Sequence, residues 1–157
     1  MIRCVLVLAV LLPNLALAQD FKGYRTTTLD AIIGEWNGRT KSDGPGVSFS
    51  RPEKIKFIVA KRGGPIPCSN AALKIVLMMI NFEDLLNQTS ITHCISLERT
   101  NGRPVVAYVQ DVIVPGLNSD VSAGQSMDIY ADVLAYQVWA DRSQNAPIML
   151  VNRFEPR

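Results

Sequence analysis

The sequence predicts an α+β fold that is rich in strands. We expect a small antiparallel, curled sheet or a partly open barrel of the OB type, with one short helix after the first strand. Three observations predict it: apolar and polar residues alternate over several short runs, turn signals separate the runs of the C-terminal half, and polar residues repeat with helical spacing in 69–88. The number of expected elements matches an OB barrel, and a sheet packed on one helix is the alternative.

The first 18 residues have the features of a secretory signal peptide. Arg3 precedes an apolar run at 5–12, and Ala16-Leu17-Ala18 provides a small-x-small cleavage site before Gln19. The apolar run is shorter than the ~20 residues that a membrane span needs. We therefore expect an exported protein, periplasmic or secreted, with no stable membrane span in the mature chain.

Loss of the leader changes both the charge and the cysteine count. It removes Arg3 and no acidic residue, so the net charge falls from +2 to +1, which argues against nucleic acid as a partner. It also removes Cys4 and leaves Cys68 and Cys94, which we expect to form a disulfide in an oxidising compartment. The chain has one histidine and no C-x-x-C, so a metal site or a redox pair is not expected.

The segment 19–52 is expected to be flexible, with one short helix at 28–36. Thr28 is a suitable N-cap, and four apolar residues follow at the spacing of one helix face: Leu29, Ile32, Ile33 and Trp36. The stretch 37–52 is rich in Gly, Ser and Pro and predicts a connector. A single strand-rich domain is expected over 53–157.

That domain begins with a strand at 54–61, in which Ile55, Phe57 and Val59 alternate with lysines. The segment 69–82 favours a mostly buried helix with a narrow polar stripe, although a buried strand is the alternative. If Cys68 and Cys94 pair, the helix must end near residue 81 or 82, because their Cα atoms must approach within about 7 Å.

The C-terminal half predicts four strands. The first, at 91–98, is joined by the hairpin signal Asn101-Gly102 to a returning strand at 104–114. After a loop at 117–125, a long strand at 127–139 is followed by a turn at 142–145 and a last strand at 147–154.

The tripeptide Gly34-Glu35-Trp36 resembles the Gly-x-Trp that opens lipocalin barrels. This resemblance implies a β-barrel that binds a small apolar ligand. We keep it as an alternative function.

No catalytic, metal-binding or cofactor motif is recognisable, so we expect no metal and no cofactor. His93 is the only histidine, and we expect it among Ile91, Ile95 and Leu97 on a buried strand face. A hydrogen-bonded core histidine is the favoured interpretation. A hydrolase that uses His93 is a further alternative.

The sharpest functional hint is a strand face that carries carboxylates and large apolar side chains. Its members are Asp128, Tyr130, Asp132, Leu134 and Tyr136. Exposed, these residues would form a contact surface for a protein, and covered, they would form a second core face. Asn87-Gln88-Thr89 also matches the N-glycosylation sequon.

These observations together predict an exported, soluble, non-enzymatic protein. We expect it to bind a protein or to serve as an accessory component of a cell-envelope or secretion assembly. The expected partner is another exported or envelope protein.

Overall fold

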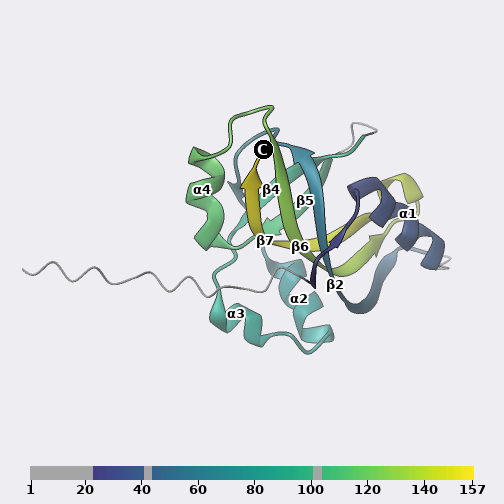
Figure 1. The fold of residues 1–157 in the computed structure, drawn as a ribbon. Coiled ribbons are helices and arrows are strands. Elements are labelled where there is room, and N and C mark those ends of the chain that lie inside the picture. Colours follow the sequence, from purple (N-terminus) through teal and green to yellow (C-terminus); the bar gives the residue numbers. More distant parts are fainter. Residues whose placement is uncertain (1–22, 41–43, 101–103) are drawn as a thin grey trace, which may run out of the picture.

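The computed structural model describes residues 23–40, 44–100 and 104–157. The chain forms a seven-stranded sheet in the order β1-β2-β6-β7-β5-β4-β3. The strands are β1 (Arg25–Thr26), β2 (Gly46–Ala60), β3 (Ile66–Pro67), β4 (His93–Glu98), β5 (Pro104–Val109), β6 (Ser126–Val138) and β7 (Ala146–Pro156). The helices are α1 (Leu29–Arg39), α2 (Ala71–Met79), α3 (Asp84–Gln88) and α4 (Val114–Ser119). Figure 1 shows α1 and α4 at opposite ends of the curled sheet, with α2 and α3 together on one side.

The α+β class and the strand-rich character agree with the sequence, but the sheet is mixed rather than antiparallel. β1 pairs with β2 in parallel, and β5 pairs with β7 in parallel, whereas the other pairs are antiparallel. The β5–β7 pair is parallel because α4 and β6 form the long connection that returns the chain in the same direction. The sheet is also not a closed barrel, because its order ends at β1 on one side and at β3 on the other.

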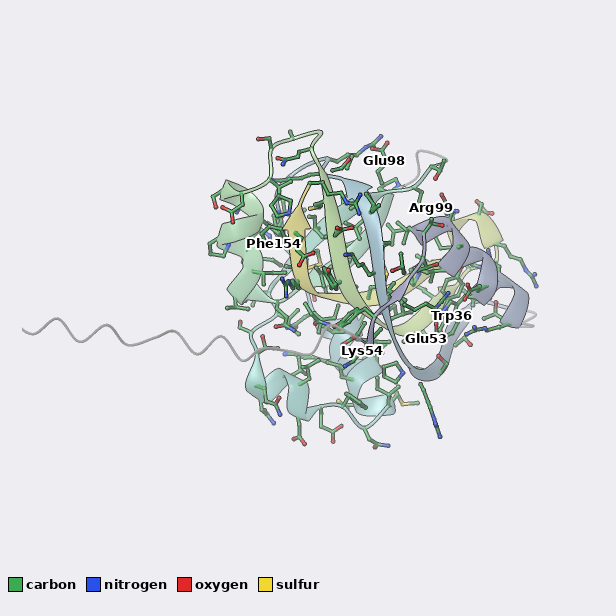
Figure 2. All side chains as sticks on the ribbon, in the orientation of Figure 1. Trp36, Glu53, Lys54, Glu98, Arg99 and Phe154 are labelled. Atoms are coloured by element: carbon green, nitrogen blue, oxygen red, sulfur yellow. A yellow bond between two sulfur atoms is a disulfide. The ribbon has the colours of Figure 1, made fainter. Side chains whose placement is uncertain are left out.

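Two apolar cores lie on the two faces of the sheet. The first core lies between the concave face, α1 and α4, and its largest fully buried members include Trp36, Tyr136, Phe57, Ile32 and Leu117. It extends from Trp36 of α1 to Phe154, which packs against it beside α4 (Figure 2). The second core lies under α2 and consists of Leu73, Val76, Leu77, Ile91, Leu134, Ala135, Ile148 and Leu150.

Helix α1 forms where the sequence predicts it and continues to Arg39. The Thr28 side chain accepts a 3.1 Å hydrogen bond from the Ala31 N–H, which satisfies one of the free amides of the first turn. The stretch predicted as a connector is different, because β2 begins at Gly46 and pairs with β6 from there. The Gly and Ser residues of this stretch do not by themselves predict a strand. Hydrogen bonds to the partner strand β6 stabilise it in the extended conformation.

The Gly34-Glu35-Trp36 tripeptide lies inside helix α1, so it does not open a strand.

The strand expected over 104–114 ends at Val109, and a 3₁₀ turn (Asp111–Ile113) and α4 follow. Pro115 lies in the first turn of α4, where its missing N–H has no intrahelical partner to lose.

The segment after Cys68 is helical, as the sequence favours, and the helix is short. α2 ends at Met79, and the separate α3 begins at Asp84. The sulfur atoms of Cys68 and Cys94 lie at disulfide bonding distance, with the Cα atoms 5.7 Å apart. The break between the two helices lets the chain return to β4 in time for this pairing.

A Schellman turn produces that break. The Phe82 N–H donates to the Leu77 carbonyl at 2.8 Å, and the Asn81 N–H donates to the Met78 carbonyl at 3.2 Å. Asn81 itself has φ 56°, in the left-handed region. Asparagine tolerates this conformation better than other non-glycine residues.

Replacing Asn81 with valine is expected to lower the free energy of unfolding by about 1–2 kcal/mol, because a β-branched residue is strained at positive φ. Asn81→Gly is the matched control and should leave stability unchanged or slightly raised. Chemical denaturation of both variants measures the difference. Equal stability of the two variants would contradict the role of the backbone conformation.

Two sequence predictions lie outside the described residues: the leader at 1–18 and the Asn101-Gly102 turn. The strands on either side of that turn pair antiparallel, and Glu98 lies opposite Pro104.

Candidate functional site

The structure divides the five residues of the predicted contact face between the two sides of the sheet. Asp128, Tyr130, Asp132 and Leu134 lie on the side of the second core, whereas Tyr136 lies in the first core, stacked on Trp36 at 5.4 Å between ring centroids. An irregularity between Val133 and Ala135 causes the switch, since it inserts one extra residue into β6 opposite β7.

The predicted face is also largely covered. Tyr130 is 7 % exposed and Leu134 is 2 % exposed, so these side chains do not form an exposed apolar patch. Leu134 packs under α2 in the second core. Leu134 thus belongs to a second core surface. Asp128, Tyr130 and Asp132 are not part of that core, so their environment is a separate one.

Those three residues belong to a polar network on β2, β6 and β7. The Tyr130 hydroxyl donates to Glu155 at 2.7 Å, and the Lys56 ammonium lies 4.8 Å from the Tyr130 ring centroid. Asp128 forms ion pairs with Lys56 at 3.5 Å and with Arg157 at 3.1 Å. Lys56 and Arg157 thus pair with the acidic side chains of β6 and β7 within the chain.

Asp132 is the least satisfied member of this network. Asn152 donates to its Oδ2 at 3.0 Å and to the Tyr24 hydroxyl at 3.1 Å. The buried Oδ1 atom has no hydrogen-bond partner in the part of the chain that the structure describes. Burial raises the pKa of Asp132 above its ordinary value, against the opposing effects of Asn152 and Lys54. A half-buried carboxylate with one bonded oxygen offers an acceptor for a water molecule but no catalytic arrangement.

His93 does not occupy the core position that the sequence predicts. Its side chain is 28 % exposed, and Ile91 packs in the second core whereas Ile95 packs in the first. Its Nδ1 atom lies 2.9 Å from Oδ1 of Asp111, a residue that the sequence analysis did not select. The 3₁₀ turn after β5 brings Asp111 beside the start of β4.

Asp111 forms several hydrogen bonds with the residues before and at the start of β4. Besides His93, it accepts hydrogen bonds from the Ser90 hydroxyl at 2.6 Å and from the Thr92 hydroxyl and N–H at 2.8 and 2.9 Å. Within the described residues, no hydroxyl bonds Nε2 of His93, the atom that a catalytic serine contacts in a Ser-His-Asp arrangement. The geometry supports a structural role for the cluster.

The pKa of Asp111 is well below its ordinary value of 3.8, because these hydrogen bonds outweigh the opposing effect of desolvation. The unfolded chain therefore binds more protons in acid than the folded chain, and Asp111 contributes stability that is lost as the pH falls below about 5. We expect Asp111→Asn to lower stability by about 2 kcal/mol at pH 7 and to flatten the loss of stability between pH 5 and pH 3. Urea denaturation across this range measures both effects, and an unchanged slope in the variant would contradict this account.

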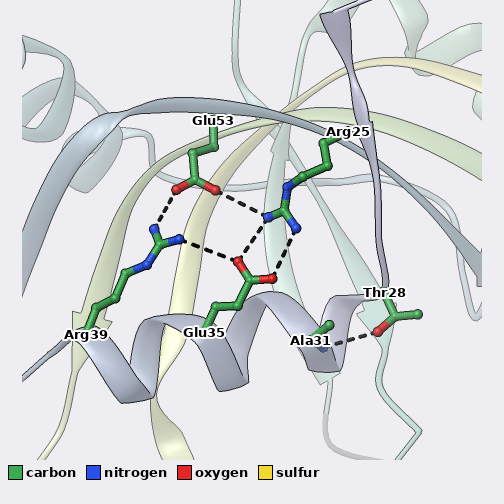
Figure 3. A network of polar contacts seen from close by, with 6 residues as sticks. All are labelled: Arg25, Thr28, Ala31, Glu35, Arg39 and Glu53. Carbon is green, nitrogen blue, oxygen red and sulfur yellow. Dashed lines mark hydrogen bonds and ion pairs between the residues drawn. The ribbon is translucent and has the colours of Figure 1, made fainter.

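Four alternating charges fix α1 against the edge of the sheet (Figure 3). Arg25 of β1 and Arg39 of α1 each contact both Glu35 of α1 and Glu53 of β2, at distances between 2.7 and 3.6 Å. Individual exposed ion pairs contribute little. The network links α1 to β1 and β2 at the surface, and it contains no group with a reactive geometry.

The most distinctive surface is the outer side of α2. Ile75, Met78 and Met79 are 60 %, 60 % and 64 % exposed, and their spacing places them on one side of α2. Phe82, which is 50 % exposed, follows the turn at the end of the helix. We call these four residues the α2 stripe. The opposite side of the same helix contributes Leu73, Val76 and Leu77 to the second core.

The sequence analysis missed this surface because it predicts a mostly buried helix. The signal was present in the composition: α2 carries one charged residue, Lys74, and is otherwise apolar around its circumference. Such a helix is normally buried on all sides, whereas the sheet covers only one side of α2.

Neither a metal site nor a membrane helix emerges from residues 23–40, 44–100 and 104–157. No three His, Cys, Asp or Glu side chains in these ranges are grouped to hold a metal ion. No helix in them is both long enough and apolar enough to cross a bilayer.

Comparison with protein-family models, with curated proteins and with solved structures found no match.

Proposed function

We propose that this chain is an exported, non-enzymatic protein that binds protein through the α2 stripe. The observation that carries the proposal is the exposure of three large apolar side chains on one side of α2, and of Phe82 just after it, while the other side of the helix is anchored in the second core. Large exposed apolar patches in monomers commonly mark contact sites. Methionine favours such surfaces because its flexible thioether adapts to a partner.

The support for export is independent of the stripe. The leader-like sequence at 1–18 predicts secretion, and a cysteine pair at disulfide distance is compatible with an oxidising compartment. Under this proposal the bond has a second effect. It ties the start of the α2 segment to β4 and so holds the stripe on a fixed support.

We also propose an OB-type interpretation of the sheet. β2, β6, β7, β5 and β4 are consecutive in the strand order, and an antiparallel bridge between Lys61 and Leu97 links the end of β2 to β4. This contact brings the two sides of the curled sheet together, which is compatible with a five-stranded, partly open Greek-key barrel. In this interpretation, α2 and α3 form an insertion between the first and second barrel strands.

The lipocalin-like and hydrolase alternatives have less support. Phe57, Ile129 and other side chains of the first core occupy the concave side of the sheet, where a lipocalin-like barrel would hold its ligand. His93 contacts a carboxylate that already bonds the nearby hydroxyls. Neither feature favours these functions over protein binding.

Cross-linking in the exported fraction of the source cells tests the proposal. A photoreactive residue at position 79 is expected to give protein adducts, and the same residue at position 112 serves as the control. Val112 is 76 % exposed but lies on the 3₁₀ turn before α4, outside the stripe. Adducts at position 112 that equal those at position 79 would refute a role for the stripe.

A further inference from the structure

We propose that residues 114–125 form a strap that closes one end of the first core and opens separately from the sheet, and that the Lys61 ammonium holds it closed. The strap consists of α4 and the loop that leads to β6, and Figure 1 shows α4 at one end of the sheet. It is distinct from the α2 stripe, and its role does not depend on the proposed function.

The strap covers the end of the first core with two apolar side chains. Leu117 is 0 % exposed and Val121 is 1 % exposed, and both belong to the first core. A Cβ atom added to Gly116 would lie 3.0 Å from the ring of Phe154, so the start of the strap lies directly on β7. Opening of the strap would therefore expose apolar surface at this end of the core.

Two main-chain hydrogen bonds join the end of the strap to Lys61, the residue that follows β2. The Lys61 N–H donates to the Gln125 carbonyl at 3.0 Å, and the Gly124 N–H donates to the Lys61 carbonyl at 2.8 Å. The Asp120 N–H, in contrast, donates to Gly116 within the strap at 2.8 Å. Breaking these few contacts disturbs the chain far less than separating two paired strands.

The Lys61 side chain reaches into the strap, and the residue is 7 % exposed. Its Nζ atom donates to the Leu117 carbonyl at 2.6 Å and to the Val121 carbonyl at 2.5 Å. In residues 23–40, 44–100 and 104–157, neither carbonyl accepts another hydrogen bond, and no ion pair includes Lys61. The ammonium thus satisfies carbonyl groups that the end of α4 leaves free.

A buried ammonium that pairs with carbonyl groups instead of a carboxylate makes the closure reversible. Removing the charge from water opposes the closed state, and two neutral acceptors offset this cost only in part. In the open state, water hydrates both the ammonium and the carbonyl groups. Burial of Leu117 and Val121 favours the closed state. Because these contributions oppose one another, the strap can open while β6 and β7 remain paired.

Native-state hydrogen exchange of the purified, oxidised wild type tests the separate opening. The amides of Lys61, Asp120, Gly124 and Gln125 should exchange at least about 100-fold faster than the slowest amides of β6 and β7. Low concentrations of urea should change their rates little, because a local opening exposes little surface. Exchange of these four amides only through global unfolding would overturn the proposal.

Three variants test the part of the ammonium. Lys61→Met keeps the side-chain length and removes the donors, so the strap amides should exchange within about tenfold of unprotected rates, while β6 and β7 keep protection of at least about 1,000-fold. Lys61→Ala should give the same result within about threefold, because the donors and not the stem hold the strap. Lys54→Met makes the same change at an exposed position of β2 and should behave as the wild type.

Two results of this comparison would overturn the proposal. Wild-type protection of the strap in Lys61→Met would show that the side-chain stem alone holds the strap. Loss of protection in β6 and β7 together with the strap would show that the strap does not open separately.

An apolar dye tests the exposure of the first core. The fluorescence of 1-anilinonaphthalene-8-sulfonate should be at least about threefold higher with Lys61→Met than with the wild type or Lys54→Met, because the dye binds exposed apolar surface. Unchanged fluorescence in a variant with an unprotected strap would overturn the assignment of the strap as the cover of the core.

Discussion

Replacing Trp36 with alanine is expected to lower the free energy of unfolding by about 3–5 kcal/mol. Trp36 is 2 % exposed and stacks on Tyr136 at an interplanar angle of 14°. Its loss would leave a large void between α1 and the sheet that the surrounding side chains fill only in part. Thermal and urea denaturation should show the change, with a melting temperature lower by roughly 10 °C.

Two further variants make this prediction specific. Trp139→Ala removes the same side chain from a site that is 43 % exposed and should cost no more than about 1 kcal/mol. Trp36→Phe keeps an aromatic ring beside Tyr136 and removes an indole N–H that has no partner among the described residues, so it should cost well under half of the alanine effect. Equal losses for Trp36→Ala and Trp139→Ala would contradict the assigned packing.

Replacing both Cys68 and Cys94 with serine is expected to lower stability by about 3 kcal/mol. The cysteines are 26 residues apart, and opening the loop between them raises the conformational entropy of the unfolded chain. The loss should be local as well as global, because the loop contains α2 and α3. Amide hydrogen exchange should therefore show faster exchange in α2 than in β6 or β7.

Reduction of the wild type provides the control for this variant. Treated with a reductant, the wild type should approach the stability of the double serine variant, and the variant should not respond. A stability of the oxidised wild type equal to that of the reduced form would contradict a contribution from the disulfide.

The elements that the sequence predicts well are those with strong local signals. Thr28 and the apolar residues after it locate α1 within a few residues. The cysteine pair limits the length of α2, since a longer helix would carry the chain too far from Cys94. The position of α1 depends on residues close together in the chain, and the length of α2 depends on the distance between two cysteines that pair.

The errors arise where distant segments determine the result. The Gly- and Ser-containing start of β2 becomes a strand only because β6 pairs with it. Alternation along β6 predicts Tyr136 on the side of Tyr130, but the extra residue opposite β7 reverses the side on which it lies. A bulge of this kind leaves no signature in an unbroken run of strand-forming residues.

In the candidate site, too, local sequence signals are predictable and contacts between distant segments are not. The sequence draws attention to the face of Asp128, Tyr130 and Asp132, but it does not show that the charges of this face pair within the chain. The α2 stripe becomes apparent only when the sheet is seen to cover one side of a helix that is apolar on both. Asp111 joins His93 through the fold, since the two residues belong to different elements.

The pairing of β2 with β6 also has a consequence for the order of synthesis. β2 ends at Ala60 and β6 begins at Ser126, so a chain that emerges from its N-terminus exposes β2 long before its main partner exists. During this interval its backbone groups are open to pairing with other chains. Arg51, Pro52, Glu53, Lys54 and Lys56 lie within β2, and charges and proline are residues that oppose such association. These residues in the middle of β2 therefore oppose association with other chains until β6 has been synthesised.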